Sequence, residues 1–216
     1  MSRETTRPDR PLSATRLLST IGPPASRPRR STPPLRFRRP TEADHAPLVR
    51  LADDWWGGRP VRRLLPRFWF RHFASTSWIA ETGDPAEAAT GGTGSRPSLP
   101  AGFLVGFVSP DRPDEAFIHL ASTNPNLRRR GIGRALYERF CDDVRARGVV
   151  RVTTTVWPGD RVAVEFHRAI GFRAIDGPGT QPMYGVPAFP DYDAEGEDRA
   201  VFVRVLDPVR EHDPTG

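Results

Sequence analysis

Arg128-Arg129-Arg130-Gly131-Ile132-Gly133 lies between a segment of alternating apolar residues and an amphipathic segment. Two glycines one residue apart let the backbone approach a ligand closely. The first turn of a helix leaves amide N–H groups unpaired and carries a partial positive charge, which suits a phosphate. The arginines, together with Arg134, add positive charge. The stretch therefore predicts a turn that binds a pyrophosphate at the start of a helix.

Other phosphate-binding turns fit this stretch less well. A P-loop needs a Gly-Lys-Ser/Thr sequence, and the chain contains no lysine. A dinucleotide-binding turn needs a third glycine at the position of Leu136. From these residues alone one alternative stays open, which is a glycine-containing turn before an amphipathic helix whose arginines are merely solvated.

The segments after the turn alternate between helix and strand. Apolar residues recur at every fourth position and predict a helix that ends at Gly148, where a C-terminal glycine cap belongs. These residues are Ile132, Leu136, Phe140 and Val144. Residues 150–156 alternate as a strand, residues 160–170 form a short helix, and residues 200–206 form the last strand.

The segments before the turn are richer in strands, which are predicted at residues 35–38, 77–82, 102–109 and 116–123. Thr41 caps a helix that runs to about Asp54, and Asp44 reaches back to the cap. A second helical stretch covers residues 61–73, and residues 83–100 form a long flexible hairpin loop. Early strands and late βαβα units predict an α/β fold, a central mixed sheet with helices on both faces.

Composition divides the chain into a disordered tail at residues 1–34, one domain at residues 35–206 and a short tail at residues 207–216. The first 34 residues hold seven Arg and seven Pro and too few apolar residues to join a core. The pI of about 10.7 and the net charge of +6 suit a nucleic-acid-binding protein. However, all 32 basic residues are Arg, which indicates a compositional bias, and nucleic acid is therefore not the expected partner.

The cellular setting follows from what the chain contains. It has a single cysteine, Cys141, which fits a reducing cytoplasm and rules out a disulfide within the chain. Cys141 lies on the apolar side of a predicted helix, so we expect core packing, with a nucleophile as the alternative. No apolar run approaches the roughly 20 residues that a membrane helix needs, so no membrane association is expected.

Three stretches of the sequence resemble the GNAT superfamily of N-acetyltransferases. The turn from Arg128 to Gly133 resembles the acetyl-CoA signature of that family, Gln/Arg-x-x-Gly-x-Gly/Ala. Residues 166–172, Phe-His-Arg-Ala-Ile-Gly-Phe, resemble its Phe-Tyr-x-x-x-Gly-Phe segment, and residues 36–44 are similar to its first strand and helix. The likeness covers about residues 35–206 and implies the GNAT acyl-CoA N-acyltransferase fold.

The resemblance implies that acetyl-CoA is the co-substrate and that no metal ion is needed. In this family the fourth strand splays from the next one, and pantetheine lies in the gap like an added strand. Backbone amides of the turn would then hold the pyrophosphate. The implied cofactor-binding residues are Ala121, Ser122, Thr123, Arg128, Arg129, Arg130, Gly131, Ile132, Gly133, Arg134 and Asp160.

Two positions depart from the family pattern. Asp160 stands where the family commonly has Asn; a carboxylate can cap the helix but cannot donate a hydrogen bond to pantetheine. His167 stands where the family usually has the Tyr proposed to protonate the departing thiolate. His167 is therefore a candidate acid, and the alternative is a histidine that packs and hydrogen-bonds locally.

The expected reaction is direct attack of a primary amine, on a small molecule or a peptide, at the thioester of acetyl-CoA. It needs a base for the amine proton, and His119 lies near the expected bulge of its strand. A buried, satisfied histidine is the alternative, and Glu81 is a weaker candidate base. The acidic residues from Asp191 to Asp198 either attract a cationic amine or form a solvated loop.

The sequence leaves the acceptor site open. A group of aromatic residues forms either the wall of that site or part of the core: Trp55, Trp56, Phe68, Trp69 and Phe70. The protein is expected to be a monomer or a homodimer. The rival interpretation is a catalytically impaired module that binds acyl-CoA but transfers nothing, favoured by the missing Tyr.

Overall fold

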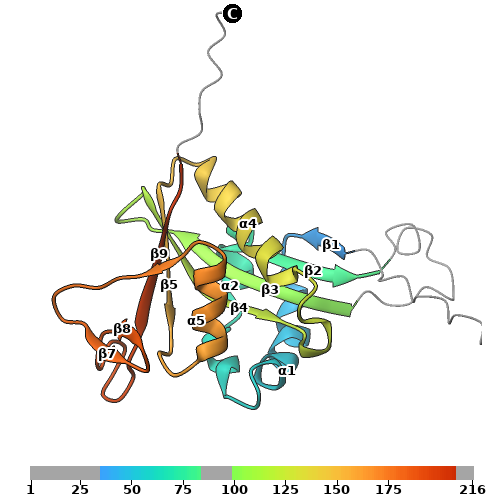
Figure 1. Ribbon diagram of the computed structural model, residues 1–216. Coiled ribbons are helices and arrows are strands. Elements are labelled where there is room, and N and C mark those ends of the chain that lie inside the picture. Colours follow the sequence, from blue (N-terminus) through green and yellow to red (C-terminus); the bar gives the residue numbers. More distant parts are fainter. Residues whose placement is uncertain (1–34, 84–98, 208–216) are drawn as a thin grey trace, which may run out of the picture. The chain divides into compact units, whose positions relative to one another are not determined.

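The computed structural model describes residues 35–83 and 99–207, which all belong to one compact unit, residues 33–216. Its centre is a seven-stranded sheet in the order β1-β2-β3-β4-β5-β9-β6 (Figure 1). The strands are β1 Leu35–Arg38, β2 Trp78–Thr82, β3 Leu99–Val108, β4 Glu115–Thr123, β5 Arg151–Val156, β6 Arg173–Ala174 and β9 Ala200–Val205. Of the neighbouring pairs among these described strands, only β4 and β5 run parallel, so the predicted mixed sheet is confirmed.

Three short strands were not predicted from the sequence. β6 has two residues, and β7 and β8 form a separate hairpin, Gln181–Met183 with Val186–Ala188. Such strands are too short to show an alternating pattern, and β7 and β8 each contain a proline. β3 also begins three residues earlier than predicted, at Leu99.

The helices are α1 His45–Trp55, α2 Phe68–His72, α4 Ile132–Arg145 and α5 Arg161–Ala169. Short 3-10 turns are η1 Glu42–Asp44, η2 Val61–Leu64, η3 Ala74–Thr76 and η4 Pro125–Leu127. The cap prediction at Thr41 is confirmed, since the Asp44 carboxylate accepts hydrogen bonds from the Thr41 amide and hydroxyl, at 2.7 and 2.9 Å. Gly148 follows α4 with φ +87°, as its predicted place after the helix requires.

The predicted continuous helix at residues 61–73 is wrong. η2 ends before Leu65, whose φ and ψ of −120° and 54° are not helical, and α2 begins only at Phe68. Pro66 disfavours a helical conformation at the residue before it, which explains the break.

The sheet is covered on both faces, with α4 and α5 in front and α1 and α2 behind in Figure 1. The front core contains Leu136 and Phe140 of α4, and the rear core contains Trp55 of α1 and Trp69 of α2. This three-layer arrangement is the architecture predicted from the sequence.

β4 and β5 separate part-way along their length, and this separation positions the site. They pair as far as Ile118 and Thr154, after which β5 continues to pair with β9 only. The buried Thr154 hydroxyl donates to the Ile118 carbonyl at 2.9 Å, so a side chain takes the place of a ladder hydrogen bond. Beyond Ile118, β4 therefore has no strand partner on its β5 side among the described residues.

β4 also carries a bulge. Its pairing with β3 passes from Ile118 opposite Gly106 to Leu120 opposite Val105, so His119 has no opposite residue. Ile118 packs in the front core and Leu120 in the rear core. The His119 ring stacks on Trp69 and so also faces the rear. The extra residue thus places His119 and Leu120 on the same face of the sheet.

Some expectations fall outside the described residues. These are the tail at residues 1–34, the loop interior at residues 84–98 and the segment at residues 208–216. Among the residues that are described, no helix has the length and apolar content needed to cross a bilayer.

Candidate active site

The turn between β4 and α4 has the backbone of an anion site. Arg129 and Gly131 have φ of 63° and 77°, in the left-handed region, and Gly131 is the N-cap of α4. Within the described part of the chain, the amides of residues 129–134 donate to no protein group. Alternating left- and right-handed residues point successive N–H groups into one concavity, which binds anions. The predicted pyrophosphate turn is thus present as a local geometry.

The arginines around this turn differ in what they contact. Arg128 donates to the Trp55 carbonyl at 3.0 Å and so holds the end of α1. Arg134 donates to the Ala169 carbonyl at 3.0 Å. Arg129 and Arg130 are exposed, and their side chains have no partner among the described residues. Only the last two are thus free to turn toward a phosphate.

Gly133 is needed for close packing between helices more than for an unusual backbone conformation. A Cβ there would lie 3.2 Å from the Phe166 ring of α5 and 3.7 Å from Thr123. A Cβ at Gly131 would meet no atom within 4 Å. The second glycine of the signature therefore lets α5 and the end of β4 approach α4, whereas the first leaves space open beside the free amides.

The open edge of β4 runs directly toward this turn. Ala121, Ser122 and Thr123 pair with β3 through Leu104, Phe103 and Gly102. Their other edge faces the gap left by β5, as the pantetheine prediction requires. The structure therefore brings this edge and the free amides of the turn into one continuous stretch of backbone.

Asp160 follows β5 and stands at the start of α5. Its carboxylate accepts from the Ala163 amide at 3.0 Å and so caps α5, as predicted. It also pairs with Arg59 at 3.3 Å, and the Arg59 guanidinium lies 4.9 Å from the centre of the Trp157 ring. Arg59 precedes η2, which contacts β4 through His119, so this ion pair links the start of α5 to the segment that holds His119. Arg59 was missed from the sequence because it lies 101 residues from Asp160.

His119 is partly exposed and fixed in orientation. Its Nε2 lies 2.7 Å from the Leu64 carbonyl, which can only accept, so Nε2 carries the hydrogen. The ring stacks on Trp69 with centroids 4.4 Å apart. Within the described residues, His119 Nδ1 has no protein hydrogen-bond partner. It is also not buried, because the buried side-chain nitrogen that lacks a partner in this part of the chain is Nδ1 of His45. The free lone pair is therefore on Nδ1, where solvent or a ligand reaches it.

Burial lowers the pKa of His119, and the hydrogen bond to Leu64 and the charge of Asp193 act in the opposite direction. A histidine with a lowered pKa is neutral near pH 7 and able to accept a proton. The influence of Asp193 also brings the predicted acidic loop close to His119.

Comparison with known proteins identifies the family to which this chain belongs. The profile of the acetyltransferase (GNAT) family matches residues 43–172. This is more than half of the chain, and it contains the turn, β4 and both candidate histidines. The chain belongs to the GNAT family. It is accordingly an acyl-CoA-dependent N-acyltransferase by family.

Individual GNAT relatives cover most of the domain. The L-2,4-diaminobutyric acid acetyltransferase of Nocardia farcinica is 27% identical over 155 residues, 72% of this chain and 73% of the relative. The enzyme of the same name from Streptomyces coelicolor is 27% identical over 168 residues, 76% and 89% of the two chains. A solved diaminobutyrate acetyltransferase of Paenibacillus lautus, in complex with L-2,4-diaminobutyric acid and coenzyme A, superimposes with a TM-score of 0.57 at 19% identity, covering 82% and 99%. The structural likeness shows the GNAT fold.

His167, which takes the place of the family's usual Tyr, lies in the core. It is 6% exposed among Tyr137, Phe166, Phe172 and Phe202. Its Nδ1 donates to the Ala163 carbonyl at 2.7 Å, and its Nε2 accepts from the Tyr137 hydroxyl at 3.0 Å. Burial lowers the pKa of His167. Because both ring nitrogens are engaged, this placement argues against the predicted acid role.

Glu81 and Cys141 are also held by their surroundings. The Glu81 carboxylate is 5% exposed and accepts two hydrogen bonds from Arg38, at 2.6 and 2.8 Å. A base candidate in such an ion pair is not free to take a substrate proton. Cys141 is 1% exposed in the front core, and burial raises its pKa to about 11, which fits the predicted packing role.

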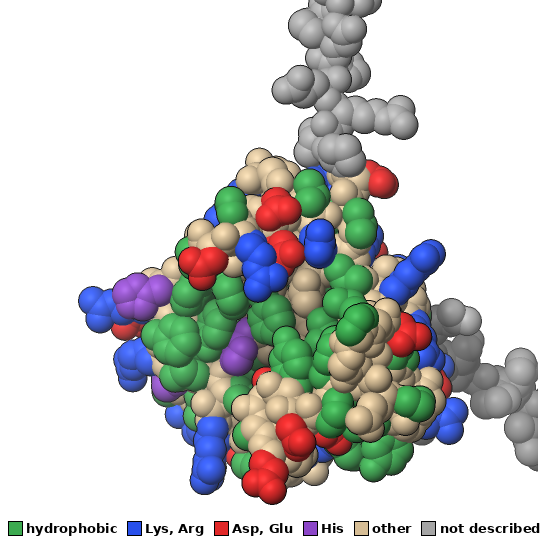
Figure 2. Space-filling model, turned by 90° about the vertical axis from the view of Figure 1, so that its left-hand side faces the viewer, with side chains coloured by type: hydrophobic (Ala, Val, Ile, Leu, Met, Phe, Trp, Pro, Cys, Tyr) green, Lys and Arg blue, Asp and Glu red, His purple; other side chains and the backbone are tan. Residues whose placement is uncertain are grey.

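The predicted aromatic residues divide between core and surface. Trp55, Trp69 and Phe70 are buried in the rear core, and Trp56 packs against it, while Phe68 is 45% exposed. Figure 2 shows a face of the molecule on which hydrophobic side chains surround a histidine.

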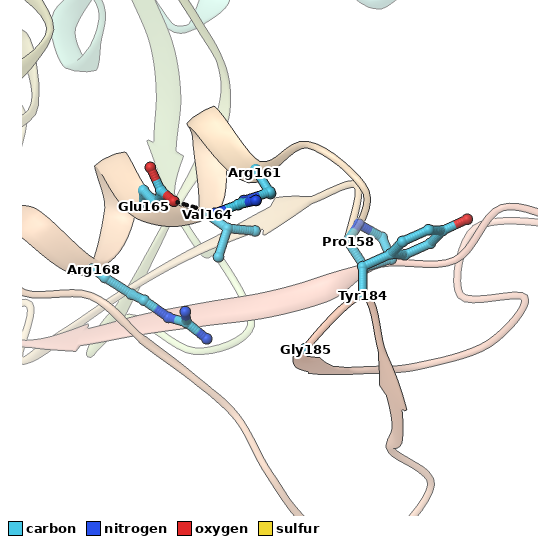
Figure 3. Close-up of a pocket in the computed structure, with 7 residues that line it drawn as sticks. All are labelled: Pro158, Arg161, Val164, Glu165, Arg168, Tyr184 and Gly185. Carbon is cyan, nitrogen blue, oxygen red and sulfur yellow. Dashed lines mark ion pairs between the residues drawn. The ribbon is translucent and has the colours of Figure 1, made fainter.

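One hollow lies away from these residues. It has a volume of about 280 Å³ between α5 and the β7–β8 hairpin (Figure 3). Its lining residues are Pro158, Arg161, Val164, Glu165, Arg168, Tyr184 and Gly185, and Arg161 pairs with Glu165 at 3.5 Å. None of these was predicted as a site residue, and the hollow does not include the turn or His119.

Proposed function

We propose that this GNAT protein binds acetyl-CoA along β4 and transfers the acetyl group to a primary amine by direct attack. The observation that carries the proposal is the edge of β4 beyond Ile118, which leads from His119 into the turn at residues 129–134. Within the described parts of the chain, this edge has no strand partner on its β5 side and the amides of the turn donate to no protein group. The edge suits pantetheine and the amides suit a pyrophosphate. Arg129 and Arg130 are free to add contacts to a phosphate.

His119 is the proposed base. The neutral amine nitrogen attacks the thioester carbonyl carbon, and Nδ1 of His119 accepts the proton that the nitrogen loses, directly or through water. The C–S bond then breaks and the electron pair leaves with the coenzyme A sulfur. A thiol with a pKa near 8.5 is a fair leaving group without an acid, so the reaction does not require His167.

The acceptor is proposed to be the primary amine of a small molecule. The two relatives named L-2,4-diaminobutyric acid acetyltransferases support this class. A cytoplasmic location is proposed from the single cysteine, which suits a reducing compartment. We propose no resident metal ion, because amine attack on a thioester needs none.

The test is His119→Ala with His45→Ala as its matched control. Each histidine has Nε2 beside a neighbouring carbonyl, Leu64 for His119 and Leu65 for His45, but His45 Nδ1 is buried. Loss of a general base lowers kcat/KM by roughly 10²-fold or more. We expect that loss for His119→Ala only, with acetyl-CoA affinity nearly unchanged.

The pH profile of the wild-type enzyme adds a second readout. Burial lowers the pKa of His119, so activity should rise with pH in a limb that lies below the ordinary value of about 6.5. This limb should vanish in His119→Ala. A protein that binds acetyl-CoA but releases no thiol with any amine would instead be the acyl-CoA-binding module.

A further inference from the structure

Around His119 the rear face of the sheet carries an aromatic cluster, defined as Phe68, Trp69, Phe73, Phe107 and Phe117. Trp69 is its centre, with ring centroids 4.4 Å from His119, 4.9 Å from Phe73 and 5.9 Å from Phe107. Phe68 contacts Trp69 at 5.0 Å, and Phe107 contacts Phe117 at 5.9 Å. The proposed base thus stands at the edge of a continuous aromatic surface.

Among the described residues, none covers this surface completely. Phe68 is 45% exposed, and Leu64, whose carbonyl holds His119, is 47% exposed. Phe73, Phe107 and Phe117 are only partly buried. Such a contiguous apolar patch beside a reactive group indicates a binding surface, since single exposed apolar residues are ordinary but grouped ones are not.

Charge at the same place favours a cation. The charge of Asp193 acts to raise the pKa of His119, and this half-exposed carboxylate forms an ion pair with Arg199 at 2.8 Å. An amine arrives as an ammonium ion and is attracted by a carboxylate and by aromatic faces. It must then lose a proton before it attacks.

We propose that the acceptor is a primary amine with an apolar body of about the size of an aromatic ring, which packs on the aromatic cluster while its nitrogen faces His119 Nδ1. This inference rests on the proposed function and narrows its substrate class. It differs from an amino acid such as L-2,4-diaminobutyrate, which has no apolar body of that size to pack on the aromatic cluster.

The experiment compares 2-phenylethylamine with L-2,4-diaminobutyrate by thiol release from acetyl-CoA. The wild-type kcat/KM should be at least roughly tenfold higher for 2-phenylethylamine, the scale that one lost aromatic contact typically produces. Phe68→Ala should reduce this ratio severalfold. Val205→Ala, at a 74% exposed apolar residue outside the cluster, should leave it unchanged.

The outcomes separate this inference from the proposed function. Preference for L-2,4-diaminobutyrate, with a ratio that Phe68→Ala does not alter, would overturn the apolar acceptor and leave the acetyltransferase intact. No thiol release with any amine would overturn the proposed function, and the inference with it. A dimer that Phe68→Glu dissociates, with acceptor KM unchanged, would assign the cluster to a second copy of the chain and also overturn the inference.

Discussion

At the scale of single residues, two histidines show how position determines what an imidazole can do. His119 and His167 both have their pKa lowered by burial. In His119 one nitrogen is held and the other is open, whereas in His167 both nitrogens are bonded inside an aromatic cage. The first arrangement leaves a lone pair that can accept a proton from a ligand, whereas the second leaves neither nitrogen open to a ligand.

The role of His167 predicts a pH dependence of stability. In the unfolded chain its pKa is about 6.5, and in the folded chain it is lower, so the unfolded state binds protons more readily. The stability that His167 contributes is therefore complete above about pH 6.5 and is lost as the pH falls through the folded pKa. Urea unfolding from pH 7.5 to 5 should show this loss.

Two variants test this prediction through the slope of the unfolding free energy against pH. His167→Phe leaves the Tyr137 hydroxyl without its acceptor and should cost about 1–3 kcal/mol at every pH. The fall in unfolding free energy below pH 6.5 should nevertheless be smaller than in the wild type. His72→Ala, at an exposed histidine, should keep the wild-type slope. Equal slopes in all three proteins would show that His167 does not titrate as described.

At the scale of elements, the site is formed where β4 ends, the turn follows and α4 begins. The turn was predictable because its information is local: two glycines, clustered arginines and a helical pattern lie within 20 residues. The environment of His167 was not predictable, because it depends on Tyr137, 30 residues away. The bulge near His119 was expected only from the family resemblance, because it depends on pairing with β3 and leaves no local pattern. The Arg59 contact joins two loops and was not expected.

Two glycines at opposite ends of α4 provide a matched test of the turn. Gly131 and Gly148 have φ of 77° and 87°, and a Cβ at either would meet no atom within 4 Å. Changing either to Ala should therefore cost a similar 1–2 kcal/mol, roughly, for the left-handed conformation. Only Gly131→Ala should weaken acetyl-CoA binding, by about tenfold or more, because charge-assisted bonds to the amides would be disturbed.

Isothermal titration calorimetry of both variants with acetyl-CoA measures this difference. Equal affinities in Gly131→Ala and Gly148→Ala, with both proteins folded, would contradict the assignment of the turn to the pyrophosphate.

At the scale of the whole molecule, the sheet divides the proposed chemistry into two sides. The front core, with α4 and α5, supports the cofactor turn. The rear core, with α1 and α2, supports the aromatic cluster, which is the proposed acceptor surface. The sequence was enough to predict a mixed sheet with helices on both of its faces. Which helix lies on which face could not be predicted, because it depends on the pairing of strands that are far apart in the sequence.

Removal of residues 1–34 should leave the domain intact, because that composition cannot bury enough apolar surface to join a core. The melting temperature should change by less than about 2 °C, which corresponds to less than 1 kcal/mol for a domain of this size. Acetyl-CoA affinity should also be unchanged. Thermal unfolding of both proteins is the measurement, and a fall of several degrees would assign the segment to the fold.

The bulge in β4 has a consequence for how such an enzyme could gain or lose activity. Without His119, Leu120 would still stand opposite Val105 and Ile118 opposite Gly106, and every apolar side chain of the strand would keep its face. His119 is thus the one residue that a regular ladder would omit. Deletion of a single codon would leave an ordinary antiparallel strand without the proposed base, and insertion of one codon would restore it. In evolutionary terms, the proposed base is therefore separable from the sheet that carries it.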